Sequence, residues 1–507
     1  MNARSASGAS PLLLTALLQL LRRLPAALAF AVLLAVCAFL GIIVALGSPQ
    51  IDLLLLAAIF GPMLLFVPAR WVLPLLIVTG FVVVGLGMYY LRIVKLFWVP
   101  YMLCMFLILK LPLDALGHHV PAAERRRPIP LFIWLLFAFF ALVLISAALN
   151  RTPLINILVG GKHFLFVWAI TFLTASRAID ETFLRKCWLL ILAIAILQLP
   201  FTVIQHFMSI DKNWDAVVGT FGGDPNGGGG SGMMAIFLAI ACGLVVALLK
   251  ARQISPVLAS AVFLSALGSV AMGEVKFFFV LMPMVVAVVL RRDFLRRPAM
   301  ALGIMLVGFA ALGAVALFYQ DEYGGRVAKS RQSETSDYLD YIFRDESNLD
   351  FVNYRTGEVS RLGAPLIWLH TVNDDGLDKL LLGYGLTASR PSETIGKGVM
   401  AKRFPFQLNT SALTILLWDS GLLGLLTFCA VLVTAALRAM KLSSAEPIPP
   451  FHRACLDGCV GALVGLMASL PYNGAAIDHV SIQFFLPFVV GYVLFWSNRV
   501  AAMRVRA

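Results

Sequence analysis

Long apolar stretches dominate this chain and constrain its fold more than any other feature. A helix needs about 20 apolar residues to cross the hydrocarbon core of a bilayer. Fourteen candidates occupy residues 24–46, 52–68, 71–89, 96–110, 129–149, 157–176, 187–207, 231–249, 255–272, 276–290, 298–318, 408–437, 454–471 and 480–498. With 60% hydrophobic and 13% charged residues and a mean hydropathy of +0.89, the chain is predicted to be an all-α polytopic membrane protein of about 14 transmembrane helices. The stretches 52–68 and 276–290 are short and could instead be re-entrant or tilted.

Lysine and arginine are distributed unevenly over the predicted loops. With a cytoplasmic N-terminus, the inner segments collect 23 basic residues, and the short outer segments collect five, namely Arg92, Lys95, Arg151, Lys212 and Lys276. Short cytoplasmic loops carry the excess of basic residues in membrane proteins, so both termini are predicted to be cytoplasmic. The excess of basic residues on the cytoplasmic side faces anionic inner-leaflet lipid and explains the net charge of +13. Nucleic acid is therefore not an expected partner.

One polar insert interrupts the apolar chain. Gln320–Gln407 spans 88 residues and holds 13 of the 27 acidic residues together with 11 basic ones, so it must lie in water. We therefore divide the chain into transmembrane helices 1–11 over residues 1–318, a long external loop over 319–407, and transmembrane helices 12–14 over 408–507. Within the loop, Leu362–His370 predicts a short helix with Pro365 in its first turn and an apolar face suited to the membrane surface.

Ionisable residues interrupt the apolar pattern at two other places. Lys162 and His163 lie within the predicted span 157–176, where such residues are costly and therefore candidates for function; Lys162 could equally extend its amine toward the membrane surface. Glu274 and Lys276 occupy a turn with almost no polar flanks. They form either a functional pair at a helix mouth or a salt-bridged helix end.

A glycine-rich segment occupies one of the predicted outer loops. It reads Gly219-Thr-Phe-Gly222-Gly223-Asp224-Pro-Asn226, followed by four glycines, Ser231 and Gly232. A nucleotide phosphate loop is not indicated, because no Gly-Lys-Ser/Thr follows and no strand precedes it. The loop is predicted to be either a pliable lid over a ligand cavity or a flexible connector.

The order of these motifs resembles the O-antigen polymerase and ligase superfamily, the Wzy and WaaL type. The matching helix carries Asn409-Thr-Ser-Ala-Leu413 followed by Asp419-Ser-Gly421-Leu-Leu-Gly424. Supporting matches are Gly219-Thr-Phe with Asp224-Pro-Asn226, the basic Lys276 after a span, and Arg361 with Trp368 ahead of Gly383-Tyr-Gly385. The resemblance covers the C-terminal part of the chain, from the glycine-rich loop onward.

This resemblance implies a bacterial inner-membrane glycosyltransferase of GT-C-like fold with the loop 319–407 in the periplasm. The implied reaction polymerises undecaprenyl-pyrophosphate-linked oligosaccharide repeat units into exopolysaccharide, capsule or O-antigen, by an inverting step without metal or cofactor. The expected partners are the lipid-linked oligosaccharide, the growing polysaccharide and membrane lipid, with a chain-length regulator and a flippase as candidate protein partners.

Two departures from the family pattern bear on the alternatives. The family often has arginine where this chain has Lys276, and lysine lacks the bidentate fork of arginine. Ligases, which transfer a finished glycan to another lipid or protein, carry histidine where this chain has Leu408. A flippase or transporter of lipid-linked oligosaccharide is a second alternative; it predicts internal repeats and short loops, whereas no duplicated segment is evident and the insert is long.

The chemistry assigns roles to particular side chains. Breaking a sugar–pyrophosphate bond releases negative charge, which preorganised cations stabilise. That requirement nominates Arg361, Lys276 and Lys162, with Arg355 and Arg390 as second choices.

A general base must reach the acceptor hydroxyl, and Glu274 and His370 are the candidates; His370 could instead be a surface residue. Asn226 and Asn409 are candidate glycan contacts, and Asn409 is also a candidate N-cap. Asp419 lies about 15 Å further along the helix from Asn409 and is expected to be a structural partner inside the bundle.

Overall fold

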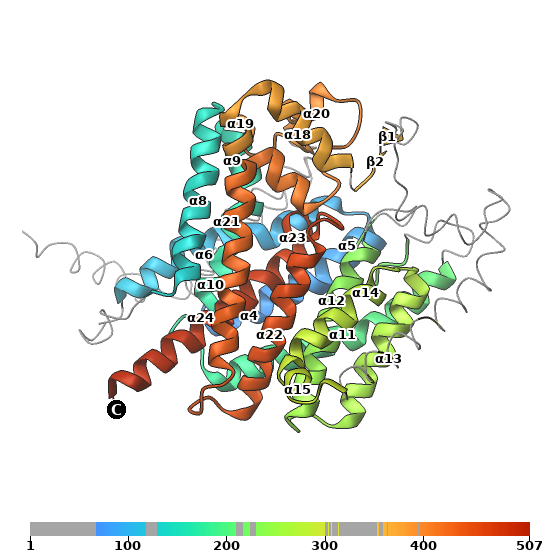
Figure 1. Ribbon diagram of the computed structural model, residues 1–507, viewed down its shortest axis with the longest axis vertical. Helices are drawn as coiled ribbons and strands as arrows, with labels where there is room; N and C mark the ends of the chain where they lie inside the picture. Colours follow the sequence, from blue (N-terminus) through green and yellow to red (C-terminus); the bar gives the residue numbers. More distant parts are fainter. Residues whose placement is uncertain are drawn as a thin grey trace, which may run out of the picture. The chain divides into compact units, whose positions relative to one another are not determined.

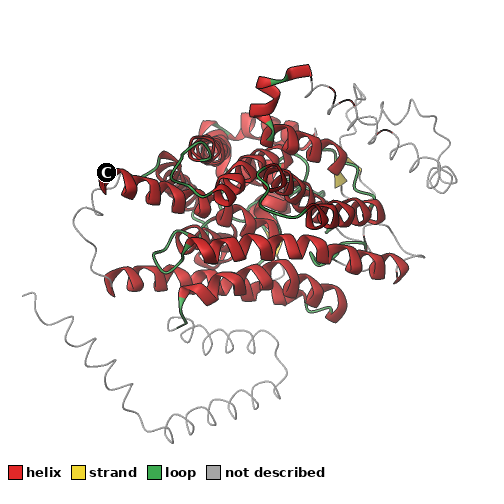
Figure 2. Cartoon of the chain, turned by 90° about the horizontal axis from the view of Figure 1, so that it is seen from below, coloured by secondary structure: helices red, strands yellow, loops and turns green. Residues whose placement is uncertain are grey.

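Helices make up nearly all of the described chain in the computed structural model (Figure 1, Figure 2). The structure describes residues 67–117, 129–208, 216–223, 230–299, 303, 306, 313, 352–353, 358–361, 363–392 and 395–506. The unit that begins at Val67 contains all of them.

The first half of this unit consists of helices with short turns between them. They are α4 (Ala69–Val78), a π-helical turn η1 (Thr79–Val83), α5 (Val84–Leu91), a 3-10 turn η2 (Val94–Phe97), α6 (Trp98–Gly117), α8 (Leu131–Leu149), α9 (Leu154–Phe164), a 3-10 turn η3 (Phe166–Trp168), α10 (Ala169–Thr174), α11 (Glu181–Met208), α12 (Ser231–Lys250), α13 (Pro256–Gly273), α14 (Phe278–Val289) and α15 (Arg291–Arg296).

The second half contains the described part of the polar insert and the last long helices. The elements are β1 (Val352–Asn353), β2 (Glu358–Val359), α18 (Gly363–Asp375), α19 (Leu377–Leu382), β3 (Pro391–Ser392), β4 (Gly396–Lys397), α20 (Val399–Arg403), α21 (Ala412–Leu442), α22 (Pro450–Ser469), α23 (Ala475–Asp478) and α24 (Val480–Arg506). β1 pairs antiparallel with β2, and β3 with β4. The insert therefore carries the predicted short helices together with two small hairpins.

Ten helical segments of the described chain are long and apolar enough to cross a membrane. They confirm ten of the fourteen predicted stretches and the class of all-α polytopic membrane protein. The stretch 276–290 forms only the 12-residue helix Phe278–Val289. The stretch 24–46 and almost all of 52–68 and 298–318 lie outside the described residues. The total of fourteen spans and the GT-C-like arrangement stay predictions.

Helix α24 forms the centre of the bundle. Its 18-residue apolar window is buried throughout, because side chains from several helices cover it. The ring of Phe485 lies 6.3 Å from Trp188 of α11 and 6.0 Å from Phe237 of α12, measured between centroids, and 6.2 Å from Phe81 of η1. Edge-on aromatic packing of this kind stabilises helix association where lipid competes for apolar surface.

Helix α21 is broken inside its apolar run. Gly421 has φ 69° and ψ −172°, so the helical conformation stops after Ser420 and resumes at Leu422. Glycine tolerates this conformation because it has no Cβ. The carbonyl oxygens released at the break find other donors, since Trp418 accepts the N–H of Tyr384 at 2.8 Å and Asp419 accepts the hydroxyl of Ser146 at 3.2 Å. Irregular backbone is thus satisfied within the protein, as a membrane requires.

The apolar face of α18 packs on α21. Trp368 and Val372 join Leu408 and Trp418 in one buried cluster. The prediction of a short helix with Pro365 in its first turn is therefore confirmed. Part of its apolar face packs on α21, whereas Leu366 and Leu369 are exposed, and its placement on the membrane surface stays a prediction.

The described insert and the basic helix ends occupy opposite ends of this unit. Figure 1 shows α18, α19 and α20 at the top and α15 with the end of α24 at the bottom. Ion pairs at the lower end join Lys250 to Asp293 and Arg291 to Asp457, the latter at 2.6 Å. Arg292 of α15 also donates to Ser443 at 2.9 Å. This separation matches the sequence-based division of inner and outer loops.

Single cysteines at the two ends test the orientation. Lys402 on α20 and Glu446 between α21 and α22 are both exposed, and the cysteines in the described chain are buried or half-buried. In intact cells, a membrane-impermeant maleimide should modify Lys402→Cys, and it should modify Glu446→Cys only after the membrane is permeabilised. Labelling of Glu446→Cys alone in intact cells would reverse the orientation.

Candidate functional site

An exposed arginine and two aromatic rings meet where three connections converge. The guanidinium carbon of Arg361, just before α18, lies 4.2 Å from the ring centroid of Tyr472 in the turn after α22. The ring of Phe277, just before α14, stacks on the same tyrosine at 3.9 Å with an interplanar angle of 10°. At these distances both groups cannot share one face, so Arg361 and Phe277 sandwich Tyr472. We call Arg361, Tyr472, Phe277, Lys276 and Glu274 the mouth cluster.

Glu274 and Lys276 enter this cluster from the turn between α13 and α14. Glu274 is the C-cap of α13 with φ 51° and ψ 33°, a left-handed conformation that glycine prefers. A non-glycine residue there costs on the order of 1 kcal/mol or more and is often found at functional sites. Lys276 is exposed. Partial burial lowers the pKa of Lys276, and the negative charge of Glu274 opposes that shift.

A second group of charges is buried among α9, α21 and α23. Arg390 forms ion pairs with Asp419, at 3.3 Å between Nη2 and Oδ2, and with Asp478. The side chains of Arg390 and Asp419 are 8% and 0% exposed, so the arginine is enclosed between two carboxylates. A buried cation is tolerated when it is paired in this way. Arg390 is therefore occupied, and its expected role as a pyrophosphate ligand is not supported by this arrangement.

The return loop from the insert wraps around Asp419. The carboxylate accepts the backbone N–H of Thr387 at 3.2 Å, the N–H of Ser389 at 3.0 Å and the Ser389 hydroxyl at 2.8 Å. Thr387 adopts φ 66°, which is unusual for a β-branched residue. Close contact between Gly383 and the backbone at Gly421 lets the loop enter the helix break. The geometry fits the expectation that Asp419 is a structural partner inside the bundle.

Lys162 lies in an aromatic cage. Its amine is 3.7 Å from the ring centroid of Trp98 and 4.2 Å from that of Phe97, with Tyr101 at 5.4 Å. The residue is buried, so the side chain points into the protein and does not extend to the membrane surface. Cation–π contacts of a desolvated amine are worth up to about 2 kcal/mol. Lys162 is thus held inside the protein by three aromatic rings.

The neighbouring His163 is joined to α24. Its Nδ1 lies 3.2 Å from Oε1 of Gln483 and 3.3 Å from the hydroxyl of Tyr101. Gln483 also donates from Nε2 to the carbonyl of His163 at 3.2 Å. These polar contacts connect α6, α9 and α24.

The described half of the glycine-rich loop is held rigidly inside the bundle. Gln205 accepts the N–H groups of Val218 at 2.9 Å and Gly219 at 2.7 Å, and Gln198 accepts the N–H of Thr220 at 2.9 Å. Residues 216–222 are buried. The expectation of a pliable lid or flexible connector is therefore wrong for this half, because two glutamine side chains of α11 satisfy its backbone.

The start of α21 differs from the expected one. Ser411 is the N-cap, with its hydroxyl accepting the N–H of Thr414 at 3.2 Å and its own N–H donating to Thr414 Oγ1 at 3.1 Å. This capping box places the helix start after Asn409. The role of Asn409 as N-cap is thus wrong, and Asn409 is half-buried in the preceding turn.

The remaining predicted residues are not part of either group. His370 is exposed on α18, about half a helical turn from Trp368 and therefore on the side away from α21. Asn226 and Arg355 lie outside the described residues. Arg361 thus lies on Tyr472, and Glu274 and Lys276 belong to the mouth cluster because their turn leads into Phe277. Arg390 and Asp419 form the buried pair, and Lys162 lies in its own aromatic cage.

Sequence reasoning missed the connection between α22 and α24. Tyr472, Asp478 and His479 all come from it, and His479 stacks on Phe221 at 5.8 Å between centroids. Burial lowers the pKa of His479 to about 4. A sequence pattern could have revealed this connection, because an acidic and a basic residue stand together at 478 and 479 directly before an apolar span. Glu274 and Lys276 were singled out by the same pattern.

Asparagine at position 419 tests the buried ion pairs. Asp419→Asn removes the negative charge that pairs with Arg390. It also places an amide N–H₂ where the carboxylate accepted N–H groups of the return loop, so the free energy of unfolding should fall by about 3–5 kcal/mol. Denaturant unfolding in mixed micelles measures the change. The matched control is Asp375→Asn, which affects the more exposed pair with Arg403 and should cost less than about 1 kcal/mol. Equal losses in both variants would contradict the structural role of Asp419.

No protein-family model matches this chain, and no curated protein matches it. The resemblance to the O-antigen polymerase and ligase superfamily therefore depends on the order of the motifs. Two of them, Arg361 with Trp368 and the helix with Asp419 and Gly421, converge on the groups described above. A function for the mouth cluster has to follow from its own geometry and charge.

Proposed function

We propose that this protein is a membrane glycosyltransferase that polymerises undecaprenyl-pyrophosphate-linked oligosaccharide repeat units into exopolysaccharide, capsule or O-antigen. The observation that carries the proposal is the mouth cluster. Arg361 packs on Tyr472, which stacks on Phe277, and a second cation, Lys276, directly precedes Phe277 in the chain, where apolar helices join the polar insert. Cations suit a pyrophosphate, and an apolar ring surface suits a lipid-linked glycan that enters from the bilayer.

Arg361 and Lys276 are the proposed ligands of the donor pyrophosphate. Both side chains are exposed, so a phosphate can approach them. Arginine offers a planar fork of N–H donors, and lysine adds a compact charge. Placed before the reaction begins, the two charges stabilise the negative charge that grows on the departing pyrophosphate.

Lys162 and Arg390 have a structural role in this proposal. The carboxylates of Asp419 and Asp478 occupy Arg390, and three aromatic rings surround Lys162. Arg390 therefore ties the return loop to α21 and α23, and Lys162 joins α9 to α6, while the exposed cations bind the donor.

The proposed transfer replaces one bond at the anomeric carbon. An acceptor sugar hydroxyl attacks that carbon, the bond from carbon to the pyrophosphate oxygen breaks, and undecaprenyl pyrophosphate leaves with the electron pair. Glu274 is the proposed base that takes the hydroxyl proton, because it lies two residues from Lys276 in a conformation that costs stability. His370 is less well placed, since it faces away from α21.

The same geometry supports polymerisation over ligation. The resemblance implies a histidine in ligases at the position of Leu408, and Leu408 is buried here in the apolar cluster with Trp368 and Trp418. The proposed location is a bacterial inner membrane, with the mouth cluster at the periplasmic face and the basic helix ends in the cytoplasm.

Replacing Arg361 tests the donor site. Arg361→Ala should abolish lengthening of purified lipid-linked repeat units, because it removes the bidentate donor, whereas Lys should restore part of the activity. Gel analysis of the glycan products measures chain growth. The matched control, Arg403→Ala, removes an exposed arginine of the same insert that pairs with Asp375, and it should retain activity.

Three other outcomes would contradict the proposal. Full chain growth by Arg361→Ala would remove Arg361 from the site. Transfer to a lipid or protein acceptor without lengthening would indicate a ligase. Movement of lipid-linked oligosaccharide across vesicles without any new glycosidic bond would indicate a flippase.

The pH dependence of donor binding tests the pairing of Glu274 with Lys276. Burial lowers the pKa of Lys276 and Glu274 raises it, so the charged lysine is lost as the pH rises through this lowered pKa. Glu274→Gln removes the opposing effect and should move the alkaline limb of donor binding to lower pH. Lys276→Arg should remove the limb, since arginine stays charged. An unchanged limb in both variants would show that another group titrates.

A further inference from the structure

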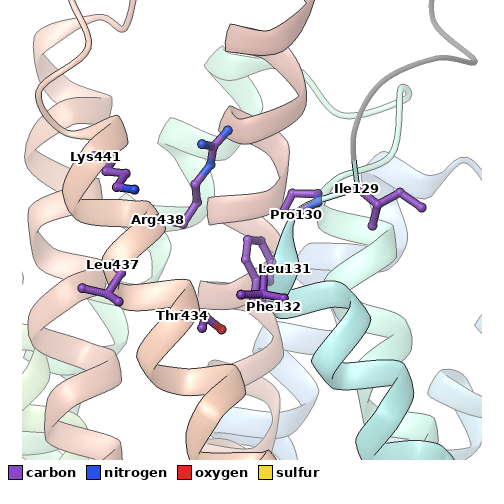
Figure 3. A pocket seen from close by; sticks show the side chains of 8 residues that line it. All are labelled: Ile129, Pro130, Leu131, Phe132, Thr434, Leu437, Arg438 and Lys441. Carbon is purple, nitrogen blue, oxygen red and sulfur yellow. The ribbon is translucent and has the colours of Figure 1, made fainter.

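A groove at the basic end of the bundle is separate from the proposed reaction site. It has a volume of about 320 Å³ and lies between the first turn of α8 and the last turns of α21. Its lining residues are Ile129, Pro130, Leu131, Phe132, Thr434, Leu437, Arg438 and Lys441 (Figure 3).

The groove has an apolar wall and a basic rim. Leu131 and Leu437 are 62% and 50% exposed, on helices that carry apolar residues on their outer faces, so lipid chains can contact them. Arg438 and Lys441 are three residues apart on α21 and thus on one face of the helix. None of the eight lining residues is acidic.

The structure positions the two cations differently. Arg438 donates from Nε to the hydroxyl of Ser497 on α24 at 3.0 Å, which limits the motion of its side chain. Lys441 is exposed, and within the described chain it has no hydrogen-bond or ion-pair partner. By contrast, Lys250 and Arg291 at the same end are paired with carboxylates. Lys441 is therefore a cation at a groove mouth whose charge is not neutralised by the described residues.

We propose that this groove binds one anionic phospholipid. The phosphate would lie at Lys441 beside Arg438, and an acyl chain would follow the apolar wall toward Thr434. The distance from Lys441 to Thr434 along the helix is about 10 Å, which matches the glycerol region and the first part of a chain. Charge complementarity selects an anionic lipid over a zwitterionic one, because basic pockets between helices at the cytoplasmic side recognise such headgroups.

Photo-crosslinking tests this site in the full chain. The protein is placed in phosphatidylcholine nanodiscs that contain a trace of one lipid probe with a photoactivatable acyl chain. The probe is phosphatidylglycerol in one sample and phosphatidylcholine in the other. Phosphatidylglycerol should label peptides 129–132 and 434–441 several-fold more than the phosphatidylcholine probe. Lys441→Glu should abolish this preference.

A matched variant separates a specific site from general attraction to a basic surface. Arg252→Glu changes an exposed arginine in the connection between α12 and α13, which does not line the groove, and it should keep the preference. Equal labelling by the two probes, or equal loss of the preference in both variants, would overturn the proposal. Circular dichroism and detergent gel filtration of each variant verify that it is folded.

Discussion

The buried ion pairs of Arg390 hold together the part of the molecule on which the candidate site depends. Removing Arg390 and Asp419 from water is costly, and the cost is offset only when the charges meet with good geometry; Asp478, which is partly exposed, supplies a second carboxylate. Arg390 belongs to the return loop, Asp419 to the break in α21, and Asp478 to α23. All three segments must therefore be in place together, and the N–H groups of Thr387 and Ser389 that also bind Asp419 prevent the loop from withdrawing alone.

This constraint extends to the mouth cluster through the connection between α22 and α24. Asp478 and Tyr472 lie in that one connection, and its carbonyl groups at Leu470 and Asn473 accept the first N–H groups of α21. Tyr472 is thus held in position, and Arg361 and Phe277 meet on its ring from opposite sides. The ion pairs of Arg390 support the backbone, and the side chains of Arg361 and Lys276 are exposed to an approaching anionic ligand.

Local sequence patterns predicted the helices well, but they did not predict which residues the charged side chains contact. The ten confirmed spans and the helix with Pro365 follow from hydropathy and proline position, which are properties of neighbouring residues. Lys162 and Arg390 were nominated because a departing pyrophosphate needs cations, yet aromatic rings surround Lys162 and carboxylates pair with Arg390. Whether such a cation faces water or a carboxylate depends on segments far away in the chain, such as Asp478, which is 88 residues from Arg390. Tyr472 escaped notice because nothing in its local sequence is unusual.

By itself, the sequence determined the membrane class, the single polar insert and the concentration of basic residues on alternate loops. Hydropathy and charge are properties of each residue type, so they can be read from the sequence without knowledge of the contacts that the residue makes. Tertiary structure decided that α21 breaks at Gly421, that Ser411 and not Asn409 caps it, and that Arg361 and Lys276 are exposed while Arg390 is neutralised. Each of these outcomes depends on which distant donor, acceptor or ring comes within contact distance, and only the packing of the helices establishes that.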